Sequence, residues 1–108
     1  MYQFHTVIKT IAGLTFWVVM SAAAGPVVER GALLAASCAS CHGTGGHSVG
    51  GTPSLAGLDT LYFIQQMQDF KSGKRPSTVM AYHASGYTDE EIKLLAAYFS
   101  SQQPGQGQ

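Results

Sequence analysis

The stretch CASCH at residues 38–42 is followed at once by the glycine-rich stretch GTGG at residues 43–46. Two thiols three positions apart can each add to one vinyl group of a haem, while the imidazole of the next residue can bind the haem iron. The spacing therefore predicts covalent attachment of one haem through Cys38 and Cys41, with His42 as an iron ligand.

Three other interpretations of residues 38–42 are open. A thioredoxin-like redox pair would lie in a βαβ context, which the sequence does not show, and a structural zinc site would need four ligands, whereas the chain has two cysteines. A disulfide between Cys38 and Cys41 is the simplest alternative in an exported chain, but it leaves His42 without a role. Haem attachment uses all three residues.

Length and charge are typical of a small carrier domain. The 108 residues include six Lys and Arg and six Asp and Glu, which gives a formal net charge of zero. Nucleic-acid binding is not predicted, because the chain has no basic footprint. A chain of this size has a marginal hydrophobic core, and a covalently attached haem would supply a large apolar body for short helices to pack around.

Residues 1–24 are predicted to be a secretory signal peptide. His5 and Lys9 give a weakly basic start, IAGLTFWVVM at 11–20 is an apolar run, and small residues at 21–24 permit cleavage after Ala24. The run is shorter than the ~20 residues that span a bilayer, so no stable membrane insertion is expected after cleavage, although an uncleaved anchor is the alternative. Residues 25–108 then form one monohaem domain, expected in the periplasm.

Apolar residues at helical spacing predict three helices in this domain. The first covers residues 27–40, the second covers 59–71 with Asp59 or Thr60 as its cap, and the third begins at a capping box formed by Thr88 and Glu91. A large residue such as Tyr98 in the third helix is expected to fill the space that Gly31 leaves in the first. The apolar residues of the first helix are Val28, Ala32, Leu33, Ala35 and Ala36. In the second helix the face predicted to point to the core contains Leu61, Ile64, Met67 and Phe70, with Phe63 beside it, and in the third helix one apolar face contains Ile92, Leu95, Ala96 and Phe99.

Met80 is the predicted second iron ligand. Pro76 breaks the helical pattern, and a methionine in the irregular segment that follows can direct its thioether across the porphyrin, opposite His42. Met67 belongs to an apolar helix face, so packing is its expected role. His83, the loop residue His47 and an open sixth position are further alternatives.

Two further segments could contact the haem. A metal-bound histidine usually donates its second ring N–H to a fixed acceptor, and the carbonyl of Pro53 is the candidate acceptor for His42. Lys71, Lys74 and Arg75 form a small basic cluster. We interpret this cluster as a solvated helix end, with contact to a haem propionate or a partner as the alternative.

The order of haem stretch, proline, methionine turn and final amphipathic helix resembles the class I cytochromes c over residues 27–101. The resemblance implies an all-α fold of short helices packed around one covalent haem, with the N- and C-terminal helices crossing. It also implies that His42 and Met80 bind the iron from opposite sides and that the carbonyl of Pro53 accepts the His42 N–H.

Within that family, PSLAGLDTLYFIQQMQDFKSGKRPSTVM at 53–80 and GYTDEEIKLLAAYFSSQ at 86–102 are similar to c4- and c553-like chains and to cytochrome subunits of flavocytochrome c sulfide dehydrogenases. The resemblance implies single-electron transfer from a sulfide-oxidising flavoprotein that carries FAD, with no catalysis by this chain alone. The alternatives are a free c553-like carrier between respiratory or photosynthetic complexes, and a haem enzyme or gas sensor with an open distal site.

Overall fold

Helix α1 (Pro26–Ala35) opens the part of the chain that the computed structural model describes, residues 25–105. A 3-10 turn, η1 (Ala36–Cys38), continues it into the short helix α2 (Ala39–His42). The predicted helix at 27–40 is therefore correct in position and runs on to His42. The predicted signal peptide, residues 1–24, lies outside the described residues.

The remaining elements are η2 (Thr44–Gly46), α3 (Thr60–Ser72), α4 (Met80–Ser85) and α5 (Asp89–Ser101). Residues 25–105 contain no strand, so the all-α prediction is confirmed.

The termini of α3 and α5 follow the predicted capping chemistry. The Asp59 carboxylate accepts the Tyr62 backbone N–H at 2.9 Å at the start of α3, and Gly73 ends that helix in the left-handed conformation. At the start of α5, Thr88 accepts the Glu91 N–H at 3.2 Å while the Glu91 carboxylate accepts the Thr88 N–H at 2.9 Å. Both predicted helix starts are confirmed.

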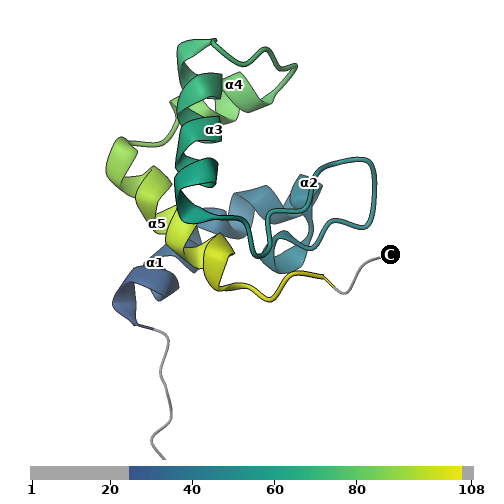
Figure 1. Cartoon of the computed structure of the whole chain (residues 1–108), viewed down its shortest axis with the longest axis vertical. Helices are drawn as coiled ribbons and strands as arrows, with labels where there is room; N and C mark the ends of the chain where they lie inside the picture. The colour runs from purple at the N-terminus through teal and green to yellow at the C-terminus, as the bar shows by residue number, and fades with distance from the viewer. Residues whose placement is uncertain (1–24, 106–108) are drawn as a thin grey trace, which may run out of the picture.

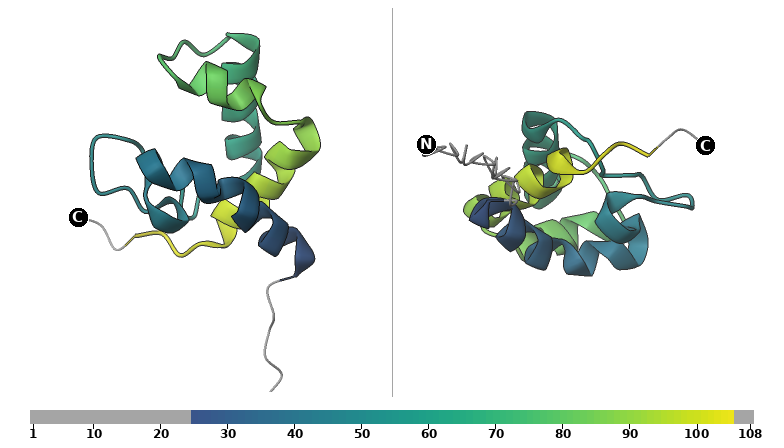
Figure 2. Two further views of the ribbon diagram at one scale, coloured as in Figure 1. Left: turned by 180° about the vertical axis from the view of Figure 1, so that it is seen from behind. Right: turned by 90° about the horizontal axis from the view of Figure 1, so that it is seen from below.

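Helices α1 and α5 pack across one another (Figures 1 and 2), and Gly31 lies at their contact. A β-carbon at Gly31 would lie 2.3 Å from the Leu94 carbonyl oxygen and 2.8 Å from Cβ of Tyr98. The missing side chain therefore lets the two backbones approach closely, and the predicted pairing of Gly31 with Tyr98 is confirmed.

Helix α3 packs against both α5 and α4 (Figure 1). Ile92, Leu95, Ala96 and Phe99 of α5 are buried as predicted, beside Phe63, Met67 and Phe70 of α3. One predicted core position is wrong, because Leu61 is 76% exposed. Two residues of the apolar pattern in the first helix, Leu33 at 79% and Ala36, are exposed as well. Helix α1 buries Gly31 and Ala35, since the face that approaches α5 must be the small one, and α3 buries Phe63 together with Met67 and Phe70.

We predict that Gly31→Ala destabilises the protein by about 1–3 kcal/mol, because the new methyl group meets a backbone carbonyl that cannot move aside. This cost should exceed the gain of about 1 kcal/mol in helix propensity. Guanidinium unfolding of the haem-loaded protein measures it. Gly50→Ala is the control, since a β-carbon there has no atom within 4 Å. Equal stability of the two variants would contradict the close approach of α1 and α5.

Candidate haem site

His42 ends helix α2 and is buried, with 8% of its surface exposed. Its Nδ1 lies 2.6 Å from the carbonyl oxygen of Pro53. A carbonyl can only accept, so Nδ1 carries the proton and donates it, which leaves Nε2 as the nitrogen with a free lone pair. The His42 ring is thereby prepared to bind a metal through Nε2. The predicted acceptor, Pro53, is brought to the predicted ligand.

Three glycines with positive φ, Gly43, Gly45 and Gly46, shape the loop that carries Pro53. Gly43 ends α2 at φ 81°, where a β-carbon would lie 1.9 Å from the His47 carbonyl oxygen. Gly46, also at φ 81°, is buried against Phe99 of α5 and accepts the Leu55 N–H at 2.8 Å. The loop therefore contains one 3-10 turn, η2, which packs against α5 through Gly46 and returns the chain toward His42.

A cavity of about 560 Å³ opens beside His42. This volume falls within the ~300–1,000 Å³ typical of small-molecule and cofactor pockets. Much of its wall is apolar, as the apolar porphyrin ring of a haem requires. The apolar side chains include Leu55, Leu58, Phe63, Met67, Phe70, Val79 and Met80. All five predicted site residues line this one cavity: Cys38, Cys41, His42, Pro53 and Met80. The residues present therefore fit a haem.

The two cysteines differ in exposure. Cys41 is exposed, whereas Cys38 is half-buried, and both are free thiols in this structure. Burial raises the pKa of the Cys38 thiol, while hydrogen bonds from Ser37 and Tyr87 partly oppose the rise. Before a thioether forms, Cys38 is therefore a protonated thiol at neutral pH. Within residues 25–105 no group of three His, Cys, Asp or Glu side chains could hold a metal ion, so the zinc alternative lacks a ligand set there.

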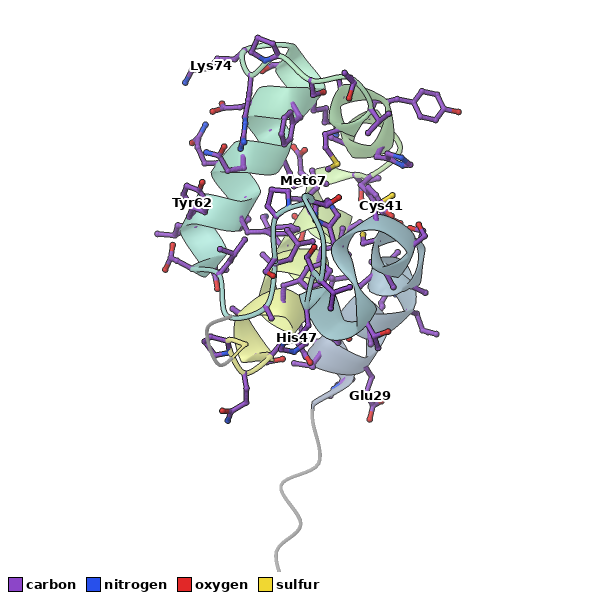
Figure 3. The ribbon with its side chains drawn as sticks, turned by 90° about the vertical axis from the view of Figure 1, so that its right-hand side faces the viewer. Glu29, Cys41, His47, Tyr62, Met67 and Lys74 are labelled. Atoms are coloured by element: carbon purple, nitrogen blue, oxygen red, sulfur yellow. The ribbon has the colours of Figure 1, made fainter. Side chains whose placement is uncertain are left out.

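Met80 is the first residue of helix α4, which the sequence analysis did not predict. The expectation of an irregular segment at Met80 was therefore wrong, because a short helix with Val79 as its N-cap begins at Met80, directly after a bend. Met67 and His83 line the same cavity. Met67 is only 5% exposed and belongs to the core (Figure 3), whereas His83 is exposed. His47 is not among the described residues that line the cavity.

Sequence reasoning missed Tyr87, which joins the two sides of the cavity. Its hydroxyl lies 2.9 Å from Ser37 Oγ and donates to the Leu34 carbonyl at 3.3 Å. Lys71 donates to the Tyr87 carbonyl at 2.7 Å and pairs with Asp89 at 3.3 Å. The turn between α4 and α5 is thus hydrogen-bonded to α1 and η1 on one side and to α3 on the other. A tyrosine in a short turn carries no sequence signal for such a role.

Comparisons with known proteins agree with this geometry. A family model described as cytochrome c matches residues 28–103. The chain is 52% identical over 77 residues to the cytochrome subunit of sulfide dehydrogenase of Chlorobaculum tepidum, a match that covers 70% of each chain. It is 37% identical over 83 residues to cytochrome c4 of Azotobacter vinelandii, covering 68% of this chain and 40% of that protein.

A further similarity is to the thiosulfate dehydrogenase electron acceptor of Stutzerimonas stutzeri, at 36% identity over 102 residues. This match covers 90% of the chain but 47% of the acceptor. The chain thus spans less than half the length of the cytochrome c4 and of the thiosulfate dehydrogenase electron acceptor.

We predict that Tyr87→Phe lowers the free energy of unfolding by about 0.5–1.5 kcal/mol, because it removes the hydroxyl that bridges to Ser37 and Leu34. Tyr82→Phe is the matched control, since Tyr82 is 83% exposed. Thermal unfolding of both variants makes the comparison. If the two substitutions lowered the free energy of unfolding equally, the hydrogen bonds from Tyr87 to Ser37 and Leu34 would not contribute to stability.

Proposed function

This chain belongs to the cytochrome c family and is an electron carrier with a covalently bound haem, and from this premise we propose that its electron donor is a sulfide-oxidising flavoprotein. In this proposal the donor oxidises sulfide at its own FAD and passes electrons singly to the cytochrome. The chain itself performs no catalysis; its residues hold the redox centre and control access to it.

We propose that Cys38 and Cys41 hold the haem through thioethers and that His42 and Met80 are the axial ligands. Haem iron supplies a one-electron couple, which methionine ligation makes more oxidising. His42 presents Nε2 to the iron because Pro53 holds its Nδ1–H. Phe63, Met67 and Phe70 line the same space with apolar surface. With His42 and Met80 both bound to it, the iron would have no position left for a substrate.

One observation carries the proposed donor. Identity of 52% over 77 residues to a cytochrome subunit of sulfide dehydrogenase is higher than the 37% identity to cytochrome c4, although both relatives share the fold. A shared fold constrains mainly the core residues. The additional identity to the sulfide dehydrogenase subunit favours a shared partner, because a common docking surface would also constrain residues on the outside of the protein. A free c553-like carrier is the second candidate, supported by the similarity to cytochrome c4.

We propose that the protein works in the periplasm after removal of residues 1–24. The apolar run at 11–20 and the small residues before position 25 support export. None of the helices within residues 25–105 has the length and apolar character needed to cross a bilayer.

The first test is a visible spectrum of the protein purified gently from its own cells, oxidised and then reduced. We expect sharp c-type bands on reduction together with a flavin signal that sulfide bleaches. The same haem bands without flavin, under conditions that keep complexes intact, would favour the free carrier. Ready carbon monoxide binding by the wild-type protein would contradict methionine ligation and support an open-site haem enzyme or sensor.

Met80 and Met67 both line the cavity, so substitution of each separates ligation from packing. We expect Met80→Ala to retain covalent haem but lose the weak long-wavelength band of methionine-ligated ferric haem. Met67→Ala should keep that band and lower stability by about 2–5 kcal/mol, because it opens a hole in the core. An unchanged ferric spectrum in the Met80 variant would refute the ligand assignment.

A further inference from the structure

Arg75 occupies a distinctive place in the cavity wall. Among residues 25–105 it is the only Lys or Arg that lines the cavity, and no Asp or Glu lines it. The cavity is otherwise walled by apolar, hydroxyl, amide and imidazole side chains. The guanidinium of Arg75 is thus the single Lys or Arg charge, among the described residues, in the wall of the proposed haem cavity.

The Arg75 side chain is held in this place by α3. Its guanidinium carbon lies 4.6 Å from the centroid of the Phe70 ring, and Nη1 donates a hydrogen bond to Oε1 of Gln66. The Arg75 backbone N–H donates to the Asp69 carbonyl at 3.0 Å. Because Phe70 and Gln66 also line the cavity, these contacts direct the guanidinium along the cavity wall.

Arg75 also differs from the lysines of the described part. Lys71 pairs with Asp89 at 3.3 Å, Lys74 with Asp69 at 3.7 Å and Lys93 with Glu90 at 2.7 Å. No carboxylate of residues 25–105 forms an ion pair with Arg75. The charge of Arg75 is therefore not neutralised by a described carboxylate and can pair with an anion in the cavity.

A haem carries two propionate carboxylates, and these anions must be accommodated when its apolar ring enters an apolar cavity. We infer that Arg75 binds a haem propionate, with the Gln66 amide as its neighbour in the same site. A guanidinium can hold a carboxylate through two parallel N–H donors. Since Oε1 of Gln66 accepts from Arg75, its Nε2 is the end that can donate to the carboxylate. This inference rests on the haem site proposed above and not on the flavoprotein donor.

The predicted consequence is electrostatic. A positive charge paired with a propionate reduces the negative charge beside the iron, and it thereby disfavours the more positive ferric state. Arg75 should raise the reduction potential of the haem. Arg75→Gln should therefore make the haem easier to oxidise without changing its axial ligands.

The test is an equilibrium redox titration of the haem-loaded variants at pH 7, followed by visible absorption. At a fixed ambient potential, we expect Arg75→Gln to lower the ratio of reduced to oxidised protein by about threefold to tenfold. Arg75→Lys should give a smaller fall, because it keeps the charge but loses the two-donor geometry. If Arg75→Gln does not fold, Gln66→Leu is the second variant and should lower the ratio in the same direction.

Lys74→Gln is the matched control. It removes the same charge one position earlier, but the Lys74 side chain is 73% exposed, does not line the cavity and extends outward from the molecule (Figure 3). Its effect on the ratio should stay below about twofold, because the charge is solvated and screened.

Three outcomes would overturn the inference. Equal shifts in Arg75→Gln and Lys74→Gln would indicate a general effect of surface charge. An unchanged ratio with lower thermal stability would indicate that Arg75 only packs on Phe70. An unchanged ratio with slower electron exchange with a partner would place the carboxylate on that partner. Wild-type protein without covalent haem would instead refute the proposed site itself, before any variant is compared.

Discussion

The hydrogen bond between His42 and the carbonyl of Pro53 is the contact on which the site depends. It joins the end of α2 to the far end of the following loop at 2.6 Å, and it determines which imidazole nitrogen faces the cavity. Its acceptor is a backbone atom, so the chain's path, and not a side chain, supplies it. That path in turn requires Gly43 to turn sharply and Gly46 to lie against Phe99 of α5.

Much of this arrangement could be predicted from local sequence. The CASCH stretch at 38–42 has a chemical meaning that depends on spacing alone, and the caps at Asp59 and Thr88 act within one helical turn. The match of Gly31 with Tyr98 was also predictable, because a glycine in a helix interior calls for a close neighbour. Features that depend on a few adjacent residues, or on one large and one small residue, can be predicted from the sequence.

Features that depend on how the elements pack around the cavity could not be predicted in the same way. Leu33 and Leu61 have the right spacing for a core face, but the cavity and the α1–α5 crossing determine which face turns inward. The helix that begins at Met80 is too short to give a periodic signal. Tyr87 contacts Ser37 and Leu34 across about fifty positions of sequence, a distance that no local pattern encodes. Arg75 was visible only as one of three basic residues, and its stacking on Phe70 distinguishes it from its neighbours.

Helix α5 contributes no side chain to the cavity wall in the described part of the chain, whose last lining residue is Tyr87. Nevertheless, α5 holds α1 at Gly31, supports α3 through Phe63 and Phe99, and carries the surface on which Gly46 rests. A polypeptide emerges from the ribosome with its N-terminus first, so every cavity-lining residue is synthesised before the helix that assembles them. The residues that line the cavity therefore precede, in the order of synthesis, the helix that supports them.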